Sequence, residues 1–232
     1  MPRTYITQEE IKRMIDMTTN VRDRLLICML FHLGYRVSEA LVLTTQDIDL
    51  DNGTITIQHL KSRINLMCPS CYARLSRSHT FCPNCGQEVK EALTKSQDHR
   101  RQRVLPLDTD TMAMLKDYIQ RGGPLSRDGK KFIFGINRHR AWQIVKESAE
   151  KAGLPKIINA ETGKTHNVSP HRLRDSFAVH AMKHDNSGDG LRILQEHLGH
   201  QSFNTTAKYR KISGEEHKGW YEKLWHGERD NG

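Results

Sequence analysis

The sequence contains few aromatic residues and no long apolar run. Phe, Trp and Tyr make up 6% of its 232 residues, and hydrophobic residues of every kind make up 36%. No stretch approaches the roughly 18 consecutive apolar residues of a membrane-spanning helix. Residues 1–14 also lack the apolar segment of a secretion signal. We therefore expect a cytoplasmic protein with no membrane partner, in a compartment where thiols stay reduced.

Acidic residues are in the minority. The chain has 27 Asp and Glu against 36 Lys and Arg, which gives a formal net charge of +9 at pH 7. Such an excess favours a polyanionic partner, most often nucleic acid, over an acidic small molecule. Internal repeats and low-complexity segments are also missing from the sequence, and its length suits one large domain or two small ones.

Cysteine is scarce as well, but four of the five cysteines stand together in two CxxC pairs, ten residues apart. The four are Cys68, Cys71, Cys82 and Cys85. Two such turns supply four thiolates in a tetrahedron, the geometry of a closed structural Zn²⁺ site. Two disulfides are the alternative, which a reducing compartment disfavours. A catalytic zinc is disfavoured because four thiolates leave no open coordination position. We predict a structural zinc ribbon.

The residue patterns predict an α+β fold that is mainly helical. Asn52-Gly53 between alternating β-branched runs predicts a hairpin, and residues 101–107 supply the third strand of a small antiparallel sheet. The cysteines fall between the second and third strands, so we interpret residues 62–100 as an inserted ribbon within a domain covering residues 1–232. Helices are expected at residues 7–19, 22–33, 37–43, 109–121, 137–152, 170–184, 189–198 and 203–212, and loops at 122–131 and 154–169.

Three separated segments carry residues suited to phosphate chemistry. Arg36 stands in GYRVSEAL, and His171 and Arg174 lie three apart on one helix face in SPHRLRDSF. His200 precedes Tyr209 by nine residues in LGHQSFNTTAKYR. Two arginines can fork onto the oxygens of one phosphate, histidines can exchange protons, and a tyrosine phenol can attack phosphorus. Taken singly, each residue also has a structural interpretation, such as an ion-paired surface arginine or a half-buried tyrosine.

Together, the segments GYRVSEALVLTTQDI, HRLRDSFAVH and LGHQSFNTTAKY resemble, in order and spacing, the three boxes of the tyrosine recombinases, the phage-integrase and Xer-like family. The resemblance implies that family's helical catalytic-domain fold. It assigns the catalytic set to Arg36, Lys61, His171, Arg174, His200 and Tyr209. Glu39 and Asp47 take supporting positions. Lys61 ends the second strand, where the family carries a catalytic lysine, and Lys90 and Lys95 are its nearby alternatives.

The resemblance further implies a site-specific recombinase that cleaves and rejoins double-stranded DNA through a 3′-phosphotyrosyl link. The family needs no metal or nucleotide for this catalysis. His171 is the expected acceptor of the tyrosine proton, and Lys61 is the expected acid for the departing 5′ oxygen. The two arginines and His200 are expected to stabilise charge in the transition state.

Assembly and source are implied in the same way. The family's C-terminal segment packs on a neighbouring subunit, and we expect self-association into a tetrameric synapse on DNA. The apolar face that would serve is formed by Trp220, Tyr221, Leu224 and Trp225. Most family members carry an N-terminal core-binding domain, which we do not expect in this chain. A prokaryotic, archaeal or viral source is expected.

Several alternatives stay open at this point. A type IB topoisomerase uses similar chemistry, a non-catalytic DNA-binding regulator could use the same scaffold, and a zinc-ribbon binding module could use the rest as support. A basic run of His99, Arg100, Arg101 and Arg103 is expected to contact the DNA backbone. Its alternative is a solvated charge cluster that protects an edge strand from aggregation.

Overall fold

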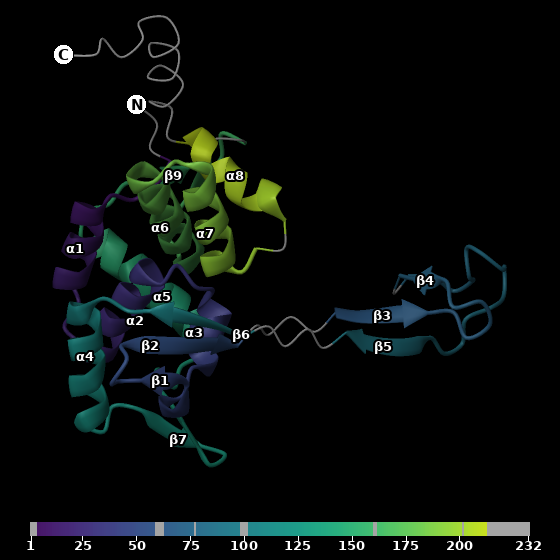
Figure 1. Cartoon of the computed structure of the whole chain (residues 1–232), viewed down its shortest axis with the longest axis horizontal. Coiled ribbons are helices and arrows are strands. Elements are labelled where there is room, and N and C mark those ends of the chain that lie inside the picture. Colours follow the sequence, from purple (N-terminus) through teal and green to yellow (C-terminus); the bar gives the residue numbers. More distant parts are fainter. Residues whose placement is uncertain are drawn as a thin grey trace, which may run out of the picture. The chain divides into compact units, whose positions relative to one another are not determined.

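The computed structural model describes residues 4–58, 63–76, 78–97, 102–159, 162–200 and 202–212. The chain divides into two compact units: the first comprises Met1–Ile57 and Arg103–Gly232, and the second comprises Gln58–Gln102. All of the helices labelled in Figure 1 belong to the first unit, whereas the second is built from strands.

The helices of the first unit are α1 (Gln8–Asp16), α2 (Val21–His32), α3 (Val37–Val42), the 3-10 helix η1 (Thr45–Asp47), α4 (Thr109–Gln120), α5 (Arg138–Lys151), α6 (Pro170–His184), α7 (Gly188–Leu198) and α8 (Phe203–Ile212). Its strands are β1 (Ile48–Asp49), β2 (Thr54–Gln58), β6 (Gln102–Pro106), β7 (Leu125–Arg127), β8 (Lys130–Phe132), β9 (Ile157–Ile158) and β10 (Thr165–His166). The second unit contains β3 (Arg63–Met67), β4 (Arg74–Leu75) and β5 (Leu93–Gln97).

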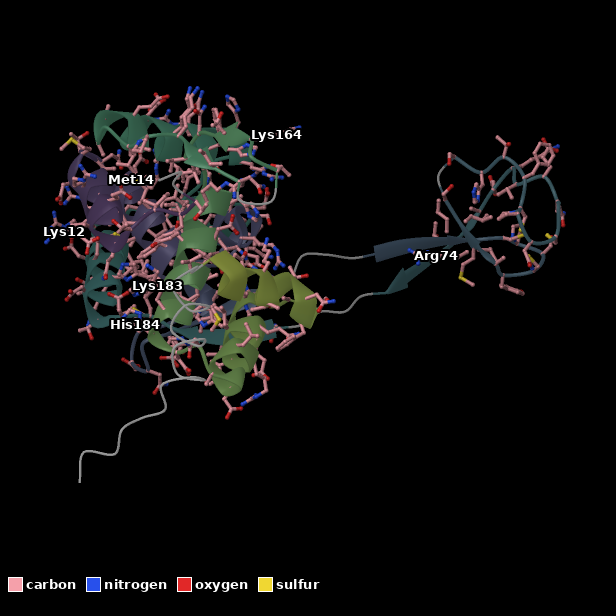
Figure 2. The ribbon with its side chains drawn as sticks, turned by 90° about the horizontal axis from the view of Figure 1, so that it is seen from above. Lys12, Met14, Arg74, Lys164, Lys183 and His184 are labelled. Carbon is pink, nitrogen blue, oxygen red and sulfur yellow. The ribbon has the colours of Figure 1, made fainter. Side chains whose placement is uncertain are left out.

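Short polar side chains start the helices where the sequence predicts them. Thr7 N–H donates to Glu10 Oε2 at 3.0 Å and Glu10 N–H donates to Thr7 Oγ1 at 3.4 Å, which is the capping box of α1. Asp108 caps α4 by a single bond, in which its Oδ1 accepts from Thr111 N–H at 3.0 Å. Along α1, Met14 is buried while Lys12 points to solvent, as Figure 2 shows. This alternation is that of an amphipathic helix lying on a core.

The main apolar core is built around α2. Every residue from Leu25 to Phe31 is buried, and α2 packs against α1, α4 and α6. A second apolar cluster joins α6, α7 and α8 and includes Tyr209. Helix α6 borders both clusters, because Leu173 belongs to the first and Val179 to the second. Side chains near the start of α6 therefore lie between the two cores.

The predicted three-stranded sheet is confirmed, with the order β1-β2-β6. β1 pairs antiparallel with β2, with Ile48 opposite Ile55. The turn between them contains Gly53 at φ +64, a conformation that glycine adopts without strain. Leu107 N–H donates to Gly53 O at 3.0 Å, which sets the end of β6 beside the start of β2. β2 and β6 are neighbours although the whole second unit separates them in sequence.

Two segments that were expected to be loops contain strands. β7 and β8 form a hairpin in which Ser126 lies opposite Lys131, and Asp128 and Gly129 occupy its turn at φ +50 and +72. This pair of positive φ angles is typical of a tight two-residue turn. The strands are largely exposed, so their sequence lacks the alternation of apolar residues from which a strand is predicted. Similarly, β9 and β10 pair within residues 154–169 through two residues each.

Within the described residues, no helix combines the length and the apolar character needed to cross a lipid bilayer.

Candidate active site

The first arginine is positioned by a tight turn between α2 and α3. Gly34 adopts φ +54, and a Cβ at this position would collide with the Phe177 ring of α6. The turn therefore requires glycine and brings the start of α3 against α6. Arg36 occupies the N-cap position of α3 and is held by Glu39: its main-chain N–H donates to Glu39 Oε2 at 2.8 Å, and its Nη1 donates to Glu39 Oε1 at 3.0 Å. The Arg36 side chain stays 28% exposed, so part of its guanidinium can still meet a ligand.

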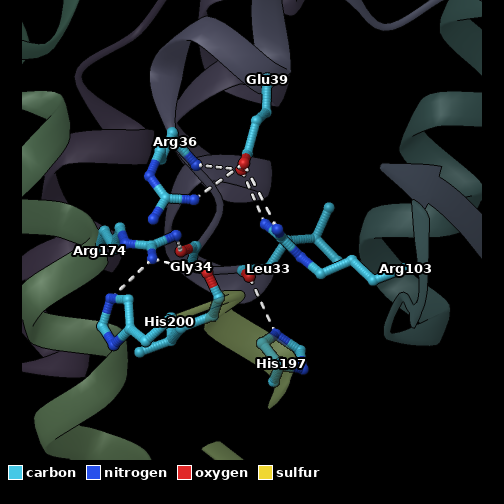
Figure 3. A network of polar contacts seen from close by, with 9 residues as sticks. Leu33, Gly34, Arg36, Glu39, Arg103, Arg174, His197 and His200 are labelled. Carbon is cyan, nitrogen blue, oxygen red and sulfur yellow. Dashed lines mark hydrogen bonds and ion pairs between the residues drawn. The ribbon is translucent and has the colours of Figure 1, made fainter. Parts of the chain in front are cut away.

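Arg174 lies deeper, on the first turns of α6. It is 3% exposed and donates from Nη1 to Gly34 O at 2.7 Å and from Nη2 to Leu198 O at 2.8 Å. Its Nη2 also lies 3.0 Å from His200 Nε2 (Figure 3). Burial, and then the neighbouring charge of Arg36, lower the pKa of Arg174 to about 10, so the guanidinium is charged at neutral pH.

His200 is neutral in this arrangement. Because a guanidinium only donates hydrogen bonds, His200 Nε2 accepts from Arg174. The proton then sits on Nδ1, which donates to Thr206 Oγ1 at 2.8 Å. Burial and the charge of Arg174 lower the pKa of His200 to about 3. The ring follows Gly199, which ends α7 in the left-handed conformation and turns the chain toward Arg174.

Tyr209 lies on α8 and is 1% exposed. The ring is stacked near the His200 ring, with centroids 6.3 Å apart. Its hydroxyl donates to Asp175 Oδ1 at 2.7 Å. Burial first, and then the Asp175 charge, raise the pKa of Tyr209 above its ordinary value. The phenol is therefore fully protonated at neutral pH.

Of the expected catalytic residues that the structure describes, His171 is the most exposed. Its side chain is 67% exposed, and its Nε2 lies 3.8 Å from Asp175 Oδ2, one helical turn along α6. Arg172 Nη1 donates to the same carboxylate oxygen at 3.1 Å. Asp175 therefore stands between His171 and Tyr209, a relationship that the sequence boxes do not reveal.

Arg103 has a position that differs from its sequence-based expectation. Its side chain is 13% exposed and turned inward, where Nη2 donates to Glu39 Oε2 at 2.7 Å (Figure 3). It was expected to contact the DNA backbone together with His99, Arg100 and Arg101. Those three residues lie outside the described residues, and so does Lys61. The strand period could have shown this, because Arg103 lies on the same face of β6 as the buried Leu105.

Other polar residues near the site have structural partners. His197 Nε2 lies 2.9 Å from Leu33 O, and its ring stacks on Phe177. Asp47, expected to be a supporting residue, accepts from Thr44 N at 2.9 Å and from Thr44 Oγ1 at 2.6 Å. It thus closes the η1 turn, which leads into β1.

The four clustered cysteines converge in the second unit. Their sulfur atoms all lie within 4.8 Å of one another, and the group can hold a metal ion. Cys71 and Cys82 are 3.5 Å apart, and Cys68 and Cys85 are 3.7 Å apart. A disulfide needs about 2.05 Å. Four thiolates about 2.3 Å from a central Zn²⁺ stand about 3.8 Å apart in a tetrahedron, so the spacing suits such an ion.

Main-chain N–H groups around the first CxxC turn lower the pKa of its two thiols, which favours thiolates there. Tyr72 N–H donates to Cys68 O at 3.0 Å, and Gly86 N–H donates to Cys82 O at 2.9 Å, so both turns are closed alike. The N–H of Ala73 and the side chain of Asn84 lower the pKa of Cys71 to about 6. The N–H groups of Cys71 and Ser70 lower the pKa of Cys68.

The helical unit brings two arginines, a histidine and a tyrosine near one another, on α6 and α8 and at the ends of α3 and α7. Residues 4–216 match the phage integrase family, and the chain belongs to that family. The resemblance drawn from the three sequence segments is confirmed.

Curated relatives agree. The chain is 29% identical over 223 residues to tyrosine recombinase XerD of Neisseria meningitidis serogroup B, which covers 90% of this chain and 59% of the relative. It is 26% identical over 227 residues to tyrosine recombinase XerA of Pyrococcus furiosus, covering 92% and 60% respectively. The chain thus spans about three fifths of the length of these relatives.

Solved structures share the fold. The crystal structure of a XerA recombinase superposes with a TM-score of 0.60 at 20% identity, over 90% of this chain and 58% of that one. The XerH site-specific recombinase, in a post-cleavage complex with a palindromic difH substrate, superposes with a TM-score of 0.62 at 19% identity, over 97% and 54%. The predicted catalytic-domain fold is confirmed.

Proposed function

We propose that this chain carries out the strand-transfer chemistry of a site-specific DNA recombinase, acting on double-stranded DNA in the cytoplasm. The observation that supports it most is that Arg36, Arg174, His200 and Tyr209 lie near one another. They come from α6, from α8 and from the segments that precede α3 and follow α7. Three of them supply hydrogen-bonding groups suited to phosphate oxygens, and the fourth supplies a nucleophile.

In the proposed reaction, Tyr209 Oη attacks the scissile phosphorus and the bond from phosphorus to the 5′ oxygen breaks. The DNA is left with a 3′-phosphotyrosyl link, and the departing oxygen takes a proton to become a 5′-hydroxyl. We assign that proton to Lys61, which follows β2 in the sequence and lies outside the described residues. A 5′-hydroxyl attacking the link reverses these steps and rejoins the strand.

The two arginines stabilise the charge that develops on the phosphate, and each donor of this kind contributes on the order of 3 kcal/mol to the transition state. A phosphate oxygen entering the site competes with His200 Nε2 for the Arg174 Nη2 proton. The imidazole released from Arg174 is then free to approach the phosphate itself. This gives His200 its proposed role, together with the two arginines.

Covalent capture tests the proposal. A nicked suicide duplex, which loses a short fragment after cleavage, is incubated with the chain and adducts are resolved by denaturing electrophoresis. The native chain and Tyr118→Phe are expected to form an adduct, since Tyr118 is a buried tyrosine whose hydroxyl donates to Gly123 O at 2.8 Å, outside the site. Tyr209→Phe is expected to form none. An adduct with Tyr209→Phe would remove Tyr209 as the nucleophile.

The joining of two sites distinguishes a recombinase from a topoisomerase. We propose that the chain assembles as a tetramer on DNA through residues 214–232, which lie outside the described residues. Deleting this segment is expected to abolish joining of two DNA sites while single-site cleavage persists. Unchanged tetramer formation on DNA after the deletion would contradict this role. Relaxation of supercoiled DNA by a monomer, without joined products, would favour the topoisomerase function.

We propose that Cys68, Cys71, Cys82 and Cys85 hold one structural zinc ion, which the sulfur spacing and the lowered pKa of Cys71 support. Such an ion crosslinks the two CxxC turns and stabilises a small unit whose apolar core is formed largely by Leu75 and the cysteines themselves. The metal has no role in the cleavage chemistry proposed here. The ribbon forms an insertion between β2 and β6, and we propose that it holds Lys61 in place.

A further inference from the structure

The hydroxyl of Tyr209 is already paired with a carboxylate. It donates to Asp175 Oδ1 at 2.7 Å, and both residues are buried, Tyr209 at 1% and Asp175 at 7% exposure. The two residues are 34 positions apart and come from α8 and α6, which pack side by side. This hydrogen bond already directs the phenol proton at a carboxylate oxygen that can accept it.

The other nearby bases are occupied or farther away. His200 accepts from Arg174 at 3.0 Å on one nitrogen and contacts Thr206 Oγ1 at 2.8 Å with the other. His171, the acceptor expected from the family resemblance, contacts Asp175 Oδ2 at 3.8 Å. Asp175 is thus the described side chain that holds the phenol proton, and His171 stands behind it.

The second oxygen of Asp175 is held in place. Arg172 Nη1 donates to Oδ2 at 3.1 Å, and His171 Nε2 lies on the same side. This fixes the carboxylate so that Oδ1 is directed at the phenol.

We propose that Asp175 is the general base for Tyr209, an inference that rests on the proposed function. As Tyr209 Oη forms its bond to phosphorus, the phenol proton moves to Asp175 Oδ1, and the bond from phosphorus to the 5′ oxygen breaks. The phosphodiester keeps its single negative charge as a phosphotyrosyl diester. On rejoining, the incoming 5′-hydroxyl loses its proton to the acid–base group at the leaving-group side, and Asp175 returns its proton to the tyrosine.

Burial and the Asp175 charge both raise the pKa of Tyr209, so spontaneous loss of the proton before attack is rare. A positioned base avoids this step, and such bases contribute roughly 100-fold or more to rate. The same hydrogen bond could instead serve only to restrain the Tyr209 hydroxyl while no DNA is bound. A purely restraining Asp175 would hold the tyrosine back, and its removal would then accelerate cleavage, which is the opposite of what a base predicts.

The test is the single-turnover rate of adduct formation on the suicide duplex. Asp175→Asn is expected to slow it about 100-fold, and Asp175→Glu, which keeps a carboxylate, to slow it less. Asp189→Asn, an exposed acid of α7, is the matched control and is expected to react at the native rate. Replacing Tyr209 by a more acidic fluorotyrosine is expected to restore much of the Asp175→Asn rate, because that phenol needs less help to lose its proton.

An unchanged or faster Asp175→Asn rate would overturn the proposal, and so would a slow rate that the fluorotyrosine leaves unchanged. If Asp175→Asn does not fold, the rate of adduct formation is measured instead in the otherwise native chain with fluorotyrosines at position 209. With a base present the rate is expected to change little as the phenol becomes more acidic, and a more than tenfold rise would overturn the assignment. No adduct from the native chain would instead refute the proposed function.

Discussion

The Arg103 guanidinium is held by the Glu39 carboxylate, 64 residues away in sequence, with Nη2 2.7 Å from Oε2. Glu39 is 2% exposed and also accepts from Arg36 Nη1 at 3.0 Å, so one carboxylate binds two arginines (Figure 3). Burial raises the pKa of Glu39, but the Arg103 charge and hydrogen bonds outweigh it and lower that pKa overall. The strand that follows the ribbon is thereby tied to the arginine that is proposed to bind phosphate.

Replacing Arg103 by Met is expected to remove one of the two arginines that pair with the buried Glu39 carboxylate. Removing one member of a buried ion pair typically costs about 3 kcal/mol of unfolding free energy. Urea denaturation measures this, with Arg121→Met as the control, because Arg121 pairs with Asp117 on the surface. The control is expected to change stability by less than about 0.5 kcal/mol. An equal loss of unfolding free energy in both variants would show that the buried Arg103–Glu39 pair stabilises the fold no more than a surface pair.

Gly199→Ala is expected to displace the Arg103 guanidinium from its position beside Glu39. Its φ is +64, and a Cβ there would lie 2.5 Å from Arg103 Nη1. Gly122→Ala is the matched control, since its φ is +75 and nothing lies within 4 Å of its Cβ position. The backbone strain of about 1 kcal/mol is common to both, so the excess loss at Gly199 reports the displaced guanidinium. Thermal unfolding together with adduct formation measures it, and identical behaviour of the two variants would contradict the close approach.

His200 is expected to make stability depend on pH below neutrality. Its folded-state pKa of about 3 lies below the roughly 6.5 of an unfolded histidine, so the unfolded chain takes up the proton first. The stabilisation is complete above about pH 6.5 and is lost as pH falls toward 3, by at most about 1.4 kcal/mol per pH unit. Denaturation of the native chain and of His200→Gln at several pH values isolates the effect. Parallel curves for the two would refute it, and the exposed His139→Gln controls for the loss of a histidine.

Replacing Cys82 and Cys85 by Ser is expected to release the zinc and unfold the ribbon. Because Gln58–Gln102 is a compact unit of its own, the melting temperature of the helical unit is expected to change little. Adduct formation is expected to slow more strongly, since the proposed Lys61 belongs to the same segment of the sequence. Metal analysis, calorimetry and suicide-substrate cleavage measure the three effects. Cys28→Ala, which removes a buried thiol of α2, is the control and is expected to retain zinc. Full cleavage activity without zinc would contradict the proposed role of the ribbon.

Much of the helical framework could be predicted from local pattern. Capping residues such as Thr7 and Asp108 act within one turn, so the helix starts follow from the sequence alone. The hairpin at Gly53 follows for the same reason. The β7–β8 hairpin was missed because its strands are exposed and bury no alternating apolar face, although Asp128-Gly129 is a turn signal.

The sequence by itself determined the family, the arginine, histidine and tyrosine positions and the cysteine cluster, because each depends on residue type and short spacing. The strand period places Arg103 on the inner face of β6, but only the tertiary structure decided that Arg103 pairs with Glu39 and that Tyr209 pairs with Asp175. Both pairs join residues far apart in the chain. The free energy that selects them comes from burying charged and polar groups together between packed elements, and no local pattern records that choice.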